Sequence, residues 1–162
     1  MPGRFTTRGG DDKNPAGETT VNPDNGLRYS PFVLFIESVD TAKAVMLYAN
    51  LYPLFQQAYV ELGYPKGYFN DRLVAVIDHL LAVPVQTGPI SVNRPDVKGA
   101  FQPVRPWVMY KFTDPALDAL SAGQKMLIRS GPVNNRRLQS KLVEIRRQIT
   151  GAALARPINA AR

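Results

Sequence analysis

Four polar side chains near the middle of the chain could form a catalytic or metal-binding site: Asp71, Arg72, Asp78 and His79. General acid/base chemistry would use His79, the only histidine, with a carboxylate to orient the imidazole and Arg72 to assist. A metal site would use both aspartates and His79, but two helical turns separate the aspartates by ~10 Å along the helix axis. One ion cannot bind both carboxylates directly across that distance.

The third interpretation of these residues is a solvated polar face of a helix, with Asp71 stabilising the helix amino terminus. The rest of the sequence favours it, because it contains no glycine-rich phosphate loop, nucleophile motif or metal-ligand spacing. The chain also has no cysteine, which removes thiol nucleophiles and thiolate metal ligands. We therefore expect no catalytic residue, no metal and no cofactor, and a protein that is not an enzyme.

A second group of residues could bind anions. From Arg94 to Arg162 the sequence has thirteen Lys or Arg against four Asp or Glu, whereas residues 1–93 have seven against nine. The net charge of +7 therefore comes from the carboxy-terminal part. Five of the basic residues belong to one predicted helix: Arg136, Arg137, Lys141, Arg146 and Arg147. They could bind nucleic acid or acidic lipid headgroups, but their scatter around the helix favours ordinary solubilising charge.

Helices should position both groups. From Asn70 onward, the polar residues alternate at helical spacing with an apolar arc of Leu73, Val76, Ile77, Leu80 and Leu81. The last helix should begin after the Gly-Pro turn at 131–132 and end at Gly151. Its apolar face is predicted to be Leu138, Leu142, Ile145 and Ile149.

An aromatic series precedes the polar group, with steps of four, three and four residues: Tyr48, Tyr52, Phe55 and Tyr59. These steps predict one stripe on a helix that begins at the N-cap Asp40. Pro53 should kink or break this helix, Gly63 should end it and Asn70 should cap the next one. The stripe could stack ligands, but core packing is the favoured interpretation.

Other local signals predict the remaining elements. Ser30 and Asp114 each precede a proline, as N-caps often do, and Ser121 with Gln124 forms a capping box. Residues 90–93 and 107–112 could pair as a small β-hairpin. The predicted fold class is therefore mainly α, a compact multi-helix domain with a small β-hairpin.

Composition divides the chain into three parts. Residues 1–27 contain almost no large apolar side chains and should form a flexible arm, unless Phe5 and Val21 hold it along the fold. Residues 28–151 should form a single helical domain, followed by a frayed tail at 152–162. No apolar run is longer than six residues, the length of the run at 31–36, so we expect no transmembrane segment in this chain.

Five motifs occur in a fixed order: ESVD at 37–40, LYPLFQ at 51–56, GYFNDRL at 67–73, IDHLL at 77–81 and LSAGQK at 120–125. Through them the chain resembles the bacterial domain-of-unknown-function family 3014, from roughly Leu27 to Gly151. Members usually have an amino-terminal membrane anchor and a further soluble portion ahead of this region. The resemblance therefore implies a carboxy-terminal portion and an inner-membrane-associated, periplasmic location. The family has no established activity, so it implies no catalytic residues.

These observations lead to three functional hypotheses. The first is a non-enzymatic binding or assembly module of a bacterial envelope-associated protein, with a protein partner or self-association. The alternative is a binder of anionic ligands, nucleic acid or acidic lipid headgroups, through the basic carboxy-terminal helix. The other alternative is an enzyme that uses the face of Asp71, Asp78 and His79.

Overall fold

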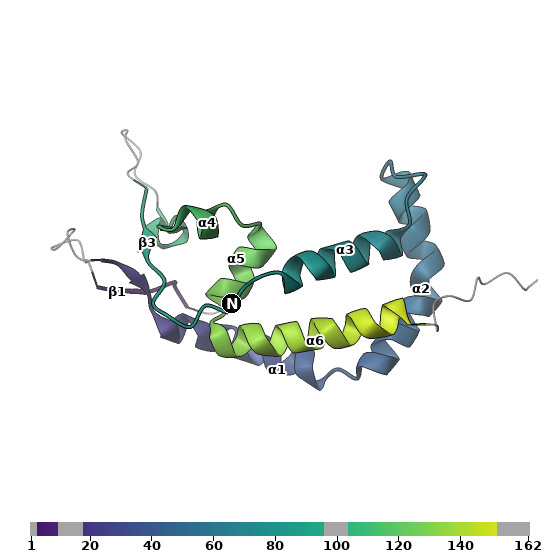
Figure 1. Ribbon diagram of the computed structural model, residues 1–162, viewed down its shortest axis with the longest axis horizontal. Helices are drawn as coiled ribbons and strands as arrows, with labels where there is room; N and C mark the ends of the chain where they lie inside the picture. The colour runs from purple at the N-terminus through teal and green to yellow at the C-terminus, as the bar shows by residue number, and fades with distance from the viewer. Residues whose placement is uncertain (1–2, 10–17, 96–103, 152–162) are drawn as a thin grey trace, which may run out of the picture. The chain divides into compact units, whose positions relative to one another are not determined.

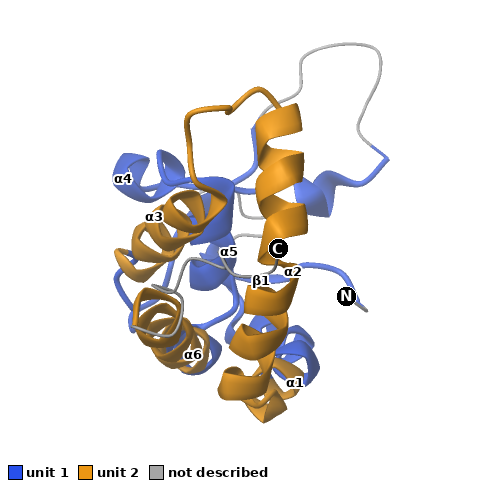
Figure 2. Ribbon diagram, turned by 90° about the vertical axis from the view of Figure 1, so that its right-hand side faces the viewer, with its two compact units in different colours: residues 1–33, 83–136 blue, residues 34–82, 137–162 orange. Residues whose placement is uncertain are grey.

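The computed structural model describes residues 3–9, 18–95 and 104–151 of the chain (Figure 1). The predicted fold class is confirmed, since most of these residues are helical and the strands form two small antiparallel pairs. The chain divides into two compact units (Figure 2). Unit 1 contains Met1–Val33 and Val83–Arg136, and unit 2 contains Leu34–Ala82 and Arg137–Arg162. The single domain predicted for 28–151 stays a prediction.

Unit 1 contains all the described strands. β1 (Thr7–Arg8) pairs with β2 (Thr20–Val21), and β3 (Val92–Asn93) pairs with β4 (Lys111–Phe112), both antiparallel. A bridge between Thr20 and Ser91 joins the two pairs. The predicted β-hairpin is thus present, although Pro106–Val108 forms the 3-10 helix η2 instead of extending the second strand.

Hydrogen bonds hold the described amino-terminal residues in unit 1. Asn25 of the 3-10 helix η1 (Pro23–Arg28) is buried, and its side-chain amide donates to the Thr6 carbonyl at 2.6 Å. Its Oδ1 accepts from the Thr6 amide at 3.0 Å, and the Phe5 ring lies 5.5 Å from that of Tyr110. This corresponds to the alternative in which the segment lies along the fold. Residues 10–17 of the predicted arm, and the tail at 152–162, lie outside the described residues.

Two of the predicted caps, Asp114 and Ser121, begin short helices of unit 1. The prediction for Ser30 is wrong, because Ser30 lies inside α1 (Ser30–Ser38) and its hydroxyl donates to the Gly26 carbonyl at 3.5 Å. Asp114 accepts from the Ala116 amide at 2.8 Å and begins α4 (Pro115–Asp118). Ser121 and Gln124 form the predicted capping box of α5 (Ala122–Arg129). The core residues of this unit, all buried, come from its helices, strands and loops: Val33, Val83, Val92, Phe112, Leu127 and Ile128.

Unit 2 is built from α2 (Thr41–Glu61), α3 (Phe69–Leu81) and the larger part of α6 (Pro132–Thr150). The end of α1 (Ser30–Ser38) also belongs to it. Its buried core is Val45, Ile77 and Ile149, one residue from each of the three long helices. Packed against this core are Tyr48, Leu73, Val74, Leu81, Leu142 and Ile145. Val74 thus replaces the predicted Val76, which is 38% exposed.

The structure bears on two predictions about helix boundaries in unit 2. Pro53 does not break α2, because it lies inside the continuous helix, and the kink that was the other expected outcome stays a prediction. The prediction for Asn70 is wrong. Asn70 does not cap α3, because its Oδ1 accepts the Tyr48 hydroxyl at 3.1 Å. Tyr68 occupies the N-cap position without a side-chain hydrogen bond to the helix. The cap comes from α2 instead, where Gln56 Oε1 accepts from the Phe69 amide at 2.9 Å.

Candidate functional site

The structure separates the four polar residues predicted as a site on α3. Asp71 and Asp78 line a shallow depression of about 500 Å³ in unit 2, whose lining residues do not include Arg72 or His79. The described residues contain no group of three or more His, Cys, Asp and Glu that could hold a metal ion. His79 therefore does not share the depression that Asp71 and Asp78 line.

Asp78 is bound by Arg146, a residue of the second predicted group. The guanidinium of Arg146 donates through Nε to Asp78 Oδ1 and, at 3.0 Å, through Nη2 to Oδ2. These hydrogen bonds favour the carboxylate form and keep the pKa of Asp78 below its ordinary value. The tertiary structure therefore joins one residue from each predicted site in an ion pair between α3 and α6.

Other basic residues of α6 also contact groups of unit 2. Arg137 lies 3.6 Å from the Glu37 carboxylate. Lys141 Nζ donates to the Val39 carbonyl at 2.6 Å and lies 3.4 Å from Glu144. Arg136 belongs to unit 1, whereas Arg147 belongs to unit 2. The five residues therefore do not form one basic surface within either unit.

The aromatic stripe of α2 packs against α3. Phe55 stacks on Phe69 with ring centroids 5.4 Å apart and on Tyr48 at 5.7 Å, and Tyr59 contacts Phe69 edge-on at 5.9 Å. Burial raises the pKa of Tyr48 to about 12 because the phenolate would lose hydration. The stripe therefore contributes to packing between the two helices, although its three tyrosines are only partly buried and Phe55 is 38% exposed.

A second stripe on α2 was not predicted. Leu47, Leu51 and Leu54 each precede an aromatic residue of the first stripe, so they repeat its spacing about 100° around the helix. Their exposed fractions are 59%, 38% and 62%. The helix has no Lys, Arg, Asp or Glu between Lys43 and Glu61. This leucine stripe is thus an apolar, uncharged surface, and a helical projection of the sequence would have revealed its spacing but not its exposure.

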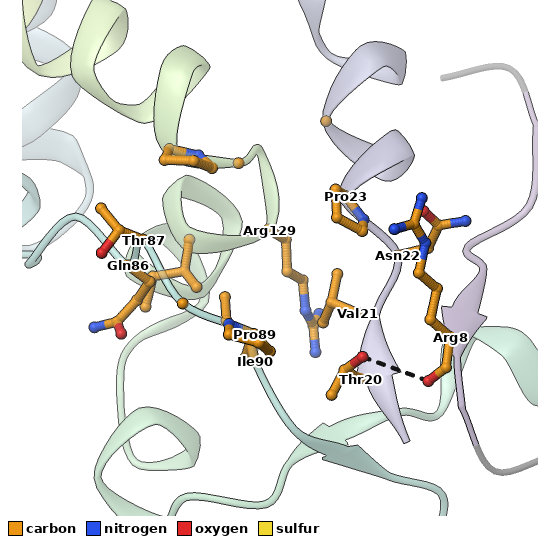
Figure 3. A pocket seen from close by; sticks show the side chains of 15 residues that line it. Arg8, Thr20, Val21, Asn22, Pro23, Gln86, Thr87, Pro89, Ile90 and Arg129 are labelled. Atoms are coloured by element: carbon orange, nitrogen blue, oxygen red, sulfur yellow. Dashed lines mark hydrogen bonds between the residues drawn. The ribbon is translucent and has the colours of Figure 1, made fainter. Parts of the chain in front are cut away.

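Unit 1 contains a cavity of about 400 Å³, shown in Figure 3. Three segments distant in sequence line it: residues from β1 through η1, the loop after α3, and the turn between α5 and α6. Its fifteen lining residues include two arginines, Arg8 and Arg129, and no Asp or Glu. Sequence reasoning missed this cavity because no single segment carries its pattern.

One family model matches the chain over residues 2–146, and its description is "Protein of unknown function (DUF3014)". The chain belongs to the DUF3014 family. This match begins well before the Leu27 expected from the motifs, so the DUF3014 region includes β1, β2 and η1. No curated protein and no solved structure matches the chain.

The cavity and the leucine stripe lie within the matched family region, and so does the depression except for Ile149, Thr150 and Gly151. The family description assigns no role to any of these surfaces. Among the described residues, no helix has both the length and the apolar character needed to cross a membrane.

Proposed function

We propose that this DUF3014 protein is a non-enzymatic assembly module of the bacterial envelope, and that the leucine stripe of α2 packs against the same stripe of a second copy. The observation that supports this is the exposure of Leu47, Leu51 and Leu54 on a helix without charged residues from 44 to 60. Exposed apolar surface in water is unfavourable, and a contiguous patch of it often marks an interaction site.

A second copy is the partner that fits best on electrostatic grounds. In a twofold symmetric dimer each patch must be complementary to itself, so like charges would face each other wherever the patch carried them. The chain has a net charge of +7, but the leucine stripe brings no Lys, Arg, Asp or Glu to the interface. Two copies can therefore approach through this surface without bringing like charges of the stripe together.

The spacing of the leucines also fits a symmetric pair of helices. In an antiparallel pair, Leu47 of one copy would face Leu54 of the other, and Leu51 would lie near the twofold axis. The steps of four and three residues are those of a coiled-coil seam, in which each side chain packs between residues of the facing helix. Met46, also exposed, would widen the apolar contact.

The test is sedimentation equilibrium of the parent protein and of the double variant Leu47→Glu/Leu54→Glu. We expect a dimer for the parent at about 0.1 mM, well above a micromolar Kd, and a monomer for the double variant. Circular dichroism should be unchanged, because both side chains are exposed. Val143→Glu, an equally exposed apolar site on α6, is the matched control and should remain dimeric. A monomeric parent protein would refute the proposal.

The alternative of an anion-binding α6 has weaker support. Arg137, Lys141 and Arg146 each lie against an acidic side chain of unit 2, which a nucleic acid or lipid phosphate would have to displace. Basic groups that are already paired contribute less to binding an external anion. The enzyme alternative lacks the grouping of Asp71, Asp78 and His79 in one depression.

A further inference from the structure

The cavity of unit 1 has the size and lining of a small-molecule site. Its volume of about 400 Å³ lies within the range of ~300 to 1,000 Å³ that such sites occupy. Val21, Pro23, Pro89, Ile90 and Ile128 supply much of its apolar wall. Gln86 and Thr87 lie on one side in Figure 3, with Arg8 and Asn22 on the opposite side and Arg129 between them.

The wall between η1 and the turn before α6 is held in place by close packing. A Cβ atom at Gly26 would lie 3.0 Å from the Ser130 carbonyl oxygen, so only glycine allows this approach without a shift. Asn134, which is buried, donates to the carbonyls of Gly26 at 2.8 Å and Ser130 at 3.0 Å. Gly131 has a φ of 85°, which also favours glycine. These contacts fix the position of η1 against the turn before α6 in this part of the cavity wall.

The charge around the cavity is positive. Its lining residues include Arg8 and Arg129 but no acidic residue, and the described part of unit 1 has nine Lys or Arg against four Asp or Glu. Arg129 donates to the Tyr110 carbonyl at 2.9 Å and lies over the Phe112 ring, so these contacts fix its position. Arg8 is more exposed, and its ion pair with Asp24 is long, at 3.8 Å, between side chains that are 60% and 65% exposed, so a carboxylate ligand can replace Asp24 at little cost. Arg8 is therefore the better placed of the two to bind an incoming anion.

From this combination we infer that the cavity binds a small organic anion with an apolar body, of which a medium-chain alkyl carboxylate is the simplest form. The apolar wall removes the hydrocarbon from water. The planar guanidinium of Arg8 pairs with the carboxylate, for which its fork of N–H donors is matched. Thr20, Asn22, Gln86 and Thr87 are neutral hydrogen-bonding groups that add no competing charge.

The first experiment is isothermal titration calorimetry of the parent protein with octanoate, octanol and acetate. Octanoate should bind saturably with one site per chain. Octanol has the same hydrocarbon without the charge and should bind at least about 10-fold more weakly, while acetate has the charge without the apolar body and should show no detectable binding. No saturable octanoate binding, or equal binding of octanol, would overturn the inference.

The second experiment places the ligand in this cavity. Arg8→Glu should weaken octanoate binding by about 10-fold or more, whereas Arg105→Glu should change it by less than about 2-fold. Arg105 is also an exposed arginine of unit 1 but does not line the cavity, so the two variants change the net charge equally. Equal losses of octanoate affinity in the two variants would show a general effect of net charge and would contradict a binding site at Arg8.

The inference is independent of the proposed dimer. The Leu47→Glu/Leu54→Glu variant changes only α2, which contributes no residue to the cavity. It should therefore bind octanoate with the affinity of the parent, whether or not the parent is dimeric. Loss of binding in this variant would mean that the octanoate site is not the cavity of unit 1.

Discussion

Gln56 should be one of the most important polar residues of unit 2, because it connects α2 to the start of α3. Its Oε1 accepts from the Phe69 amide at 2.9 Å and from the Tyr52 hydroxyl at 3.1 Å. Its Nε2 donates to the Gly67 carbonyl at 2.9 Å. It thereby performs, from another helix, the role that an N-cap residue usually performs within its own helix.

Gln56→Ala removes all three hydrogen bonds. Each contributes ~1 kcal/mol, and the side chain is only partly buried, so water can replace some of the lost partners. We expect the free energy of unfolding to fall by ~2 to 3 kcal/mol. With a denaturant slope of ~2 kcal/mol per molar urea, the urea midpoint should fall by ~1 to 1.5 M.

The adjacent residue provides the control for this measurement. Gln57 is exposed and donates only to Glu61, one turn away on the same helix, at 2.9 Å. Gln57→Ala should therefore lower the free energy of unfolding by less than ~0.5 kcal/mol. Gln56→Glu keeps both acceptor bonds but loses the donor to Gly67, so its loss should be intermediate. Equal midpoints for Gln56→Ala and Gln57→Ala would refute the role assigned to Gln56.

Two further predictions concern the packing of α2 and α3. Tyr48 should release its proton near pH 12, above the ordinary value of 10.0, because burial raises its pKa. The unfolded chain loses this proton first, so the contribution of Tyr48 to stability should be complete below about pH 10 and decrease as the pH rises toward 12. Tyrosinate absorbance should show a late titration step that Tyr48→Phe removes; a final step near pH 10 would contradict the burial. Ile77→Ala should cost ~2 to 5 kcal/mol in urea unfolding, because Ile77 is 3% exposed, whereas Val76→Ala should cost less than ~1 kcal/mol. Similar losses of unfolding free energy in the two variants would mean that Ile77 is not part of the core of unit 2.

Where a local interaction determines the boundary of an element, the sequence was sufficient to predict that boundary. Asp40, Asp114 and Ser121 each accept from a backbone amide two or three residues later, so the cap is defined within one turn. Gly63, with a φ of 99°, follows the end of α2 as predicted. The β-hairpin was also predictable, since its strands have β-favouring residues on both sides of a loop.

Longer-range interactions were not predictable from the same patterns. Asn70 has the composition of an N-cap, but Tyr48 lies within hydrogen-bonding distance only once α2 and α3 pack, and Gln56 then supplies the cap. The amino-terminal segment contains few apolar residues, yet the buried side chain of Asn25 binds its backbone. Backbone hydrogen bonding leaves no hydrophobic periodicity in the sequence.

For the candidate sites, too, local features were predictable from the sequence and long-range contacts were not. The sequence by itself determined the mainly helical fold, its local caps, the helical spacing of the α2 stripes and the absence of cysteine chemistry. Only the tertiary structure decided that Asp78 pairs with Arg146 and that Leu47 and Leu54 stay exposed while the aromatic stripe packs. It also formed the cavity from three distant segments. The physical reason is that periodicity gives the faces of a helix, whereas exposure, pairing and cavities depend on which segments pack against those faces.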